Sequence, residues 1–169
     1  DPYQLKYATA LVGLRNQEEE VAKSRKLISM QGEPAAPLAV DGWANGSPLT
    51  DADLQGKVVL LDFWAIWCPG CIEGFPHLRE LHDKYADKGL VIIGVTQYFN
   101  YKWDPERNAP VQVDPEEEEI PHAEEREVVE RFVKNHELKH RIAFDDQAQM
   151  TRFYLANGLP HLVLIDRQG

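Results

Sequence analysis

Two cysteines, Cys68 and Cys71, are the residues of this chain whose type and spacing most directly allow chemistry. They follow an apolar run, Val58 to Leu61, and precede a helical pattern, so we expect them where a buried strand passes into a helix. The first turn of a helix offers unpaired backbone N–H groups and the positive end of the helix dipole, and both favour a thiolate. Cys68, at the expected N-cap, is therefore predicted to have the lower pKa and to be the nucleophile.

Cys71 lies one turn further along the expected helix, where we predict it to be more buried and to resolve a mixed disulfide. Pro69 suits the first helical position, where a backbone N–H is not needed. Side chains three residues apart on a helix have Cβ atoms roughly 5–6 Å apart, whereas a disulfide needs about 3.8 Å. A bridge between the two cysteines must therefore distort the helical turn, and a strained bridge is easier to reduce. Such a pair suits exchange better than a structural role.

Asp62 is a carboxyl group within an expected strand whose two faces are otherwise apolar. Burial raises the pKa of a carboxyl group, and a raised pKa suits a proton donor or acceptor for Cys71. A carboxylate that is hydrogen-bonded for structural reasons alone is the other interpretation. We predict the catalytic role, because Asp62 is so close to the thiols along the chain.

The Trp-Cys-Pro-Gly-Cys segment at 67–71, followed by Pro76, closely resembles the motif of the thioredoxin superfamily. The Pro-Gly dipeptide and the flanking segments are more similar to the TlpA/ResA-type extracytoplasmic branch. This resemblance implies an α/β thioredoxin-like fold, with a central mixed sheet flanked by helices. It also implies a thiol-disulfide oxidoreductase that acts on protein thiols and disulfides together with a redox partner, needs no cofactor, and works in the periplasm or at a membrane anchor in bacteria.

Two positions depart from the TlpA branch. Asp62 is similar to the buried Asp of thioredoxin, where the branch commonly carries Asn. A Glu that commonly lies three residues after the second cysteine is replaced here by Gly74, with Glu73 one place earlier. We therefore assign the proton relay to Asp62.

The segment 158–161, Gly-Leu-Pro-His, precedes an apolar run and resembles the superfamily's proline segment. By that resemblance the Leu159–Pro160 peptide bond is cis and the proline faces the cysteine pair. The backbone of Leu159 would then pair with a substrate peptide. The expected substrate-binding residues are Trp67, Pro69, Gly70, Leu159 and Pro160.

Two other functions remain open. Cys68, Cys71 and His161 could form a soft metal site that handles copper or zinc. A redox-silent binding module could act through residues 96–123. A peroxiredoxin is disfavoured, because Ala65 occupies the position of the threonine that activates a peroxidatic thiol.

Composition narrows the classes of protein further. The net charge of −10 disfavours nucleic acid or an anionic membrane surface as a partner. The two cysteines are too few for a disulfide scaffold or a four-thiolate metal site, and Ile72 excludes the haem-attachment signature. No apolar run is long enough to span a membrane. The chain begins without a signal-like segment, so the extracytoplasmic location rests on the resemblance alone.

The chain is expected to comprise an N-terminal helical segment, 1–32, and a thioredoxin-like domain, 33–169. Residues 1–31 could form one helix or two. An Asn-Gly turn within 38–50 predicts an N-terminal β-hairpin. The family's final strand and helix have no counterpart after 162–165, so we expect the domain to be incomplete at its C-terminus. Further strands are predicted at 58–61, 90–95, 141–144 and 162–165, and helices at 72–85, 124–135 and 147–156.

Residues 96–123 form an insertion after the second central strand and have no clean template. Four aromatic residues crowd its start, prolines forbid a long helix, and Glu116–Glu119 is an acidic run. A solvated loop is one interpretation. A partner-recognition surface is another, in which the aromatics anchor a basic partner that the acidic side chains select. Calcium binding by the glutamates is a third.

Overall fold

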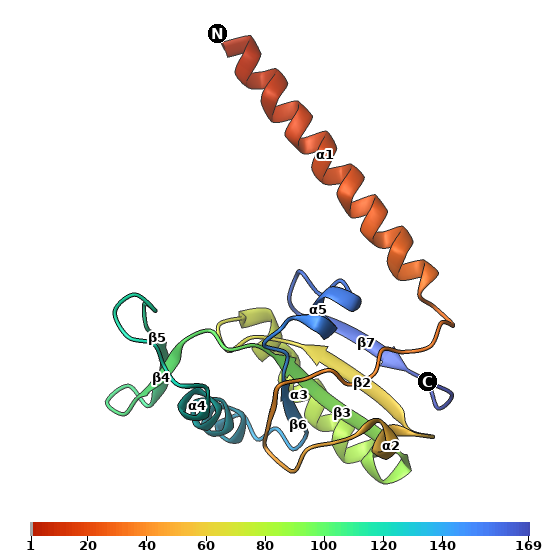
Figure 1. Ribbon diagram of the computed structural model, residues 1–169, viewed down its shortest axis with the longest axis vertical. Helices are drawn as coiled ribbons and strands as arrows, with labels where there is room; N and C mark the ends of the chain where they lie inside the picture. Colours follow the sequence, from red (N-terminus) through yellow and green to blue (C-terminus); the bar gives the residue numbers. More distant parts are fainter. Residues whose placement is uncertain (1) are drawn as a thin grey trace. The chain divides into compact units, whose positions relative to one another are not determined.

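The computed structural model describes residues 2–169, with side chains from residue 15 onwards. The chain divides into two compact units, the first ending at Pro34 and the second spanning Ala35–Gly169. The first unit is dominated by one continuous helix, α1 (Pro2–Ser29). Of the two possibilities for the N-terminal segment, one helix rather than two is therefore observed (Figure 1).

The second unit is built on a five-stranded mixed sheet in the order β1-β6-β3-β2-β7 (Figure 1). The central pairs β2·β3 and β3·β6 are parallel, whereas the outer pairs β1·β6 and β2·β7 are antiparallel. This confirms the predicted thioredoxin-like α/β arrangement. The strands are β1 (Gly42–Ala44), β2 (Val58–Phe63), β3 (Leu90–Thr96), β6 (Arg141–Phe144) and β7 (His161–Ile165).

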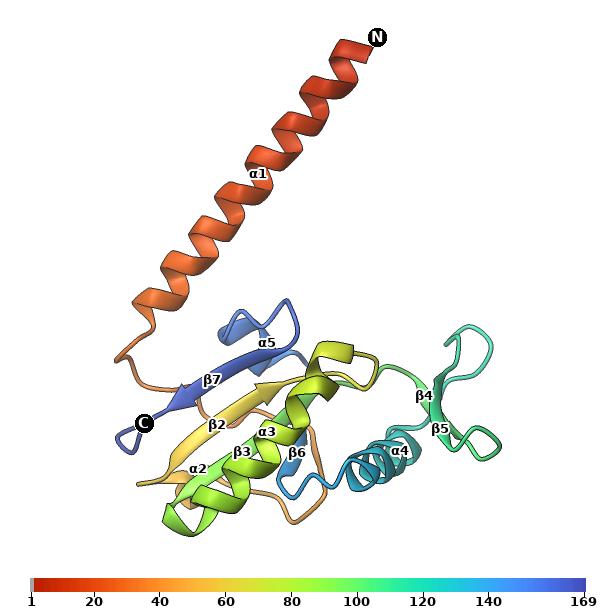
Figure 2. The same ribbon diagram turned by 180° about the vertical axis from the view of Figure 1, so that it is seen from behind.

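The longest helix of this unit, α3 (Pro69–Tyr85), crosses one face of the sheet (Figure 2). It joins the parallel strands β2 and β3, as the apolar spacing of its residues predicts. The helix α4 (His122–Asn135) leads into β6. The remaining helices are short: α2 (Asp51–Leu54), the 3₁₀ turn η1 (Ala86–Lys88) and α5 (Gln149–Phe153).

Aromatic rings join these two long helices to the end of β2. The indole of Trp64, the residue after β2, lies 5.5 Å from the ring of Phe75 on α3 and 5.9 Å from that of Phe132 on α4. Burying each such side chain contributes about 1.5–3 kcal/mol. On β3, a Cβ atom at Gly94 would lie 2.7 Å from Cδ1 of Ile142 and 2.9 Å from Nε1 of Trp64. Glycine is therefore required where Trp64 packs on the sheet.

The expected β-hairpin over 38–50 is wrong. Strand β1 pairs with β6, and residues 47–50 carry no strand. The Asn45-Gly46 turn does form, with φ of 56° and 137°, but the amide of Asn45 donates to the carbonyls of Leu138 and His140. These two bonds hold the turn against the chain that enters β6, so β1 pairs with that strand.

The insertion folds into a small sheet of its own rather than a bare loop. Strands β4 (Tyr101–Asp104) and β5 (Ala109–Gln112) pair antiparallel and stand apart from the main sheet (Figures 1 and 2). The guanidinium of Arg131 on α4 lies 4.2 Å from the ring centroid of Trp103 on β4. The insertion is therefore attached to α4 and has a defined structure.

The sequence left metal binding open and predicted no membrane span. Within residues 15–169, whose side chains are described, no group of three or more His, Cys, Asp or Glu side chains could hold a metal ion, so neither the calcium interpretation nor the copper or zinc alternative gains support. Of the helices formed by the described residues, none is both long enough and apolar enough to cross a bilayer.

Candidate functional site

The cysteine pair lies at the start of α3. Cys68 is the N-cap residue, with extended backbone angles (φ −92°, ψ 103°), and Pro69 begins the helix. The backbone N–H of Cys68 donates to the carbonyl of Ala65 in the turn that leaves β2, and the Cys71 N–H donates to Sγ of Cys68 at 3.2 Å. The two sulfurs are joined in a disulfide. The sulfur of Cys68 thus occupies the place where a helix stabilises an anion.

Exposure does not separate the two cysteines. Cys68 is 5% exposed and Cys71 is 3% exposed, so the expected difference in burial is slight. The residues around them are open instead: Trp67 is half exposed, and Pro69 and Gly70 are exposed. What distinguishes Cys68 is its position at the helix start, next to the exposed residues that an incoming polypeptide can reach.

The loop before β7 meets the cysteine loop. The Leu159–Pro160 peptide bond is cis, as the resemblance implies. A Cβ atom built at Gly70 would lie 3.4 Å from Cδ of Pro160, so these two residues are in near contact. The antiparallel pairing of β2 with β7 explains this, because Phe63 pairs with His161 and thereby places Pro160 at the end of the strand that leads to the cysteines.

His161 lies on the other face of the sheet. Its ring contacts that of Phe63 at 5.8 Å, and Phe63 also contacts Tyr154. Successive side chains of a strand alternate between faces, so Phe63 points away from the face on which Trp64 packs against α3. The geometry therefore does not assemble His161 with the two cysteines as metal ligands.

Asp62 lies in the middle of the sheet, paired with Gly94 on β3 and Leu162 on β7. It alternates with Phe63, which places its carboxyl group on the face covered by α3. Only 3% of the residue is exposed, and burial raises the pKa of the carboxyl group to about 7. The predicted burial is confirmed, whereas the transfer of a proton between Asp62 and Cys71 stays a prediction.

Two further residues lie near the site: the sequence interpretation named Phe99 only as one of the four aromatics of the insertion, and it did not single out Glu125. Phe99, at the start of the insertion, meets the indole of Trp67 edge-on at 5.7 Å. Glu125, on the first turn of α4, is 2% exposed and accepts hydrogen bonds from the backbone that carries Phe99. One signal was available: Glu125 has the same helical spacing as Val128, Val129 and Phe132, which form the apolar face of α4.

Comparisons with known proteins agree with this geometry. Residues 30–169 match the family model described as Redoxin. The thiol-disulfide oxidoreductase ResA of Bacillus cereus (strain ZK / E33L) is 32% identical over 140 residues, which cover 83% of this chain and 66% of that protein. A ResA protein from Bacillus thuringiensis subsp. konkukian (strain 97-27), 31% identical, is matched over 79% of this chain and 63% of its own length, so the chain spans slightly less than two thirds of these curated relatives.

Solved structures share the fold. A thiol-disulfide isomerase from Corynebacterium glutamicum superposes with a TM-score of 0.60 at 25% identity, covering 82% of each chain. A protein from Chlorobium tepidum, named as a candidate thiol:disulfide interchange protein DsbE, superposes with a TM-score of 0.57 at 28% identity, covering 82% of this chain and 79% of the other.

Proposed function

Because this chain belongs to the Redoxin family, we propose that it is a thiol-disulfide oxidoreductase that exchanges its Cys68/Cys71 pair with protein substrates. One observation carries the proposal: the sulfur of Cys68 caps α3 and accepts the N–H of Cys71. A thiolate at that position is stabilised by the helix start. The names of the similar ResA and isomerase proteins support the same chemistry.

In the reducing direction, the Cys68 thiolate attacks one sulfur of a substrate disulfide. A mixed disulfide forms between Cys68 and that sulfur, and the other substrate sulfur leaves as a thiolate. Cys71 then loses its proton and attacks Sγ of Cys68, which releases the second substrate thiolate and restores the Cys68–Cys71 disulfide. Two electrons pass from the protein to the substrate, and the reverse sequence oxidises a substrate dithiol.

Asp62 would manage the proton of Cys71. Its pKa of about 7 means that the carboxyl group exchanges a proton readily at neutral pH. Burial is the cause of this pKa, and the group belongs to the strand that leads directly to the cysteine turn.

The substrate chain would bind across the two adjoining loops. Trp67, Pro69 and Gly70 offer exposed surface on one side, and the partly buried Leu159 and the exposed Pro160 lie on the other. An extended peptide can pair with the backbone at Leu159. Gly70 and Pro160 lie close together, so the two loops adjoin at this point.

The test is a redox titration of the full chain in glutathione buffers, read by alkylation of Cys68 and Cys71. A two-electron transition is expected, and Cys68 should react with iodoacetamide at pH 7 faster than free cysteine does. In parallel, Cys71→Ser should accumulate a mixed disulfide with glutathione, whereas Cys68→Ser should not. A Cys68 no more reactive than free cysteine at this pH would refute the proposed mechanism.

We further propose an extracytoplasmic location, supported by the resemblance to the TlpA/ResA branch. A membrane-impermeant maleimide applied to intact cells that produce the full-length protein should label the reduced cysteine pair. Protection of the pair until the cells are broken would contradict this location.

A further inference from the structure

A buried carboxylate clamps the backbone where the insertion begins. Oε1 of Glu125 accepts the N–H of Phe99 at 2.7 Å, and Oε2 accepts the N–H of Asn100 at 3.1 Å. Glu125 lies on the first turn of α4, where the helix dipole favours a negative charge. Hydrogen bonds to an ionised acceptor are stronger than neutral ones. The pair of bonds therefore fixes two consecutive residues of the chain relative to α4.

Asn100 extends this clamp through the whole insertion. Its backbone adopts a left-handed conformation (φ 61°). Its side-chain amide donates to the carbonyls of Val113 and Glu118, and its side-chain oxygen accepts the N–H of Ile120. The start and the end of the insertion are thus held at one point, next to Glu125.

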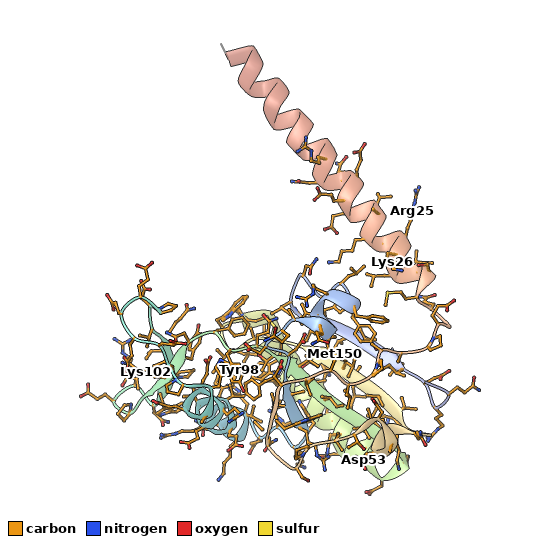
Figure 3. All side chains as sticks on the ribbon, viewed as in Figure 1. Arg25, Lys26, Asp53, Tyr98, Lys102 and Met150 are labelled. Atoms are coloured by element: carbon orange, nitrogen blue, oxygen red, sulfur yellow. A yellow bond between two sulfur atoms is a disulfide. The ribbon has the colours of Figure 1, made fainter. Side chains whose placement is uncertain are left out.

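The clamp determines where the aromatic rings lie. Tyr98 stacks between His122, at 3.8 Å, and Phe144, at 4.4 Å, and its position is labelled in Figure 3. Phe99, the next residue, is held through its N–H by Glu125, and its ring meets Trp67 at 5.7 Å. Trp67 directly precedes Cys68 and is 50% exposed. An apolar surface made of the Phe99 and Trp67 rings therefore adjoins the attacking sulfur.

We propose that Glu125 is a positioning residue for disulfide exchange: it holds Phe99 against Trp67, and these two rings together receive the side chain next to the substrate's cysteine. This inference rests on the proposed function and deepens it by naming a substrate class. Protein disulfides in which a bulky apolar or aromatic residue neighbours the attacked cysteine fit this surface, because aromatic pairs gain energy beyond their buried area.

The test uses two probe peptides, each linked to glutathione by a disulfide and identical except for Phe or Gly immediately before the cysteine. The second-order rate of reduction by the reduced full chain is measured for each. The wild type should prefer the Phe peptide by roughly two- to tenfold, the factor expected for one aromatic contact. Because both rates come from one protein sample, a loss of folded protein cancels in their ratio.

Variants then assign the preference to the clamp. Phe99→Ala and Glu125→Ala should bring the ratio of the two rates close to one. Glu125→Gln retains one acceptor oxygen for Phe99 but places an amide NH₂ group against the N–H of Asn100, so an intermediate ratio is expected. Glu127→Ala, an exposed change on the same helix, should keep the wild-type ratio.

Each outcome decides a separate point. A wild-type ratio of one, or a ratio that Phe99→Ala leaves unchanged, overturns the two-ring surface. A full wild-type ratio in both Glu125 variants overturns the positioning role. Should Glu125→Ala not fold, Glu125→Gln decides that point alone. Failure of the wild type to reduce either peptide would instead remove the proposed function, and that result is distinct from equal rates.

Discussion

Asp62 and Glu125 are two carboxyl groups buried to nearly the same extent, at 3% and 2% exposure, in different surroundings. Glu125 accepts two backbone N–H groups at a helix start. Asp62 lies in the centre of the sheet, and burial raises its pKa to about 7. The comparison shows that carboxyl groups buried to a similar depth serve two different uses. Glu125 holds two backbone N–H groups, whereas burial raises the pKa of Asp62 into the range that suits proton exchange.

Removing the carboxylate of Glu125 should have the largest effect on stability. Glu125→Ala leaves two partly buried N–H groups without their acceptor. A fully buried group left unpaired costs about 1–3 kcal/mol, so we expect a loss of roughly 2–5 kcal/mol. Urea unfolding at pH 7 measures it, with the exposed Glu127→Ala as the matched control. Equal stability of the two variants would mean that Glu125 does not act as a clamp.

For Asp62 the comparison predicts the opposite change in stability: removing its charge should stabilise the folded protein above neutral pH. Its pKa is raised in the folded protein, from 3.8 to about 7, so its contribution to stability is fully present below pH 3.8 and is lost as pH rises through 7. Asp62→Asn should therefore be more stable than the wild type at pH 8, by roughly 2–4 kcal/mol. Urea unfolding of the oxidised proteins at pH 4 and pH 8 tests this.

The kinetic counterpart is slower exchange. Asp62→Asn cannot accept the Cys71 proton, so resolution of the mixed disulfide at pH 7 should slow by roughly 10²-fold, within the usual range for a general base. Near-equal stability of variant and wild type at pH 4 is the expected control result. If the stability difference between Asp62→Asn and the wild type does not change with pH, or if their exchange rates are equal, Asp62 has only a structural role.

His140 is a buried imidazole whose pKa shifts in the direction opposite to that of Asp62. Burial, with a smaller contribution from His82, lowers the pKa of His140 from 6.5 to about 4. The stability that neutral His140 contributes is fully present above pH 6.5 and is lost as pH falls through 4, by up to about 3 kcal/mol. The free energy of unfolding therefore falls with falling pH because of His140, whereas it rises because of Asp62. The effect of His140 should appear clearly in Asp62→Asn between pH 6.5 and 4. Adding His140→Gln to that variant should remove this pH dependence.

The smallest expected effect concerns the second attachment of the insertion. Arg131→Ala removes the cation–π contact with Trp103 and should cost about 0.5–1 kcal/mol. Arg131→Lys keeps the charge but loses the planar stacking group, so we expect a smaller loss. Urea unfolding resolves the series. An effect as large as that of Glu125→Ala would show that the clamp is not the main anchor of the insertion.

The parts of the fold that the sequence predicted correctly are those set by local patterns. The apolar run before the cysteines, the helix that follows them and the next apolar run gave β2, α3 and β3, because their periodicities are contained in each segment. The burial of Asp62 followed from the same strand pattern. The cis bond before Pro160 needed the family resemblance, because most bonds before proline are trans.

The errors involve partners that are distant along the chain. The Asn45-Gly46 turn indicated a local hairpin, but β1 pairs with β6 through bonds to the backbone of Leu138 and His140, which no local pattern reveals. Likewise, the position of Phe99 depends on Glu125, which follows it after the whole insertion. The acidic residue on the apolar face of α4 was visible in the sequence, whereas its acceptor role required the folded backbone.

The titration point of Asp62 bears on the direction of electron flow. A pKa raised to about 7 places the central carboxyl group close to its point of hydrogen-ion exchange at neutral pH. Making the internal bridge requires a group that takes up a hydrogen ion, and opening it requires a group that supplies one. A single side chain therefore equips this chain for both halves of a redox cycle, and the partners available would determine which half predominates.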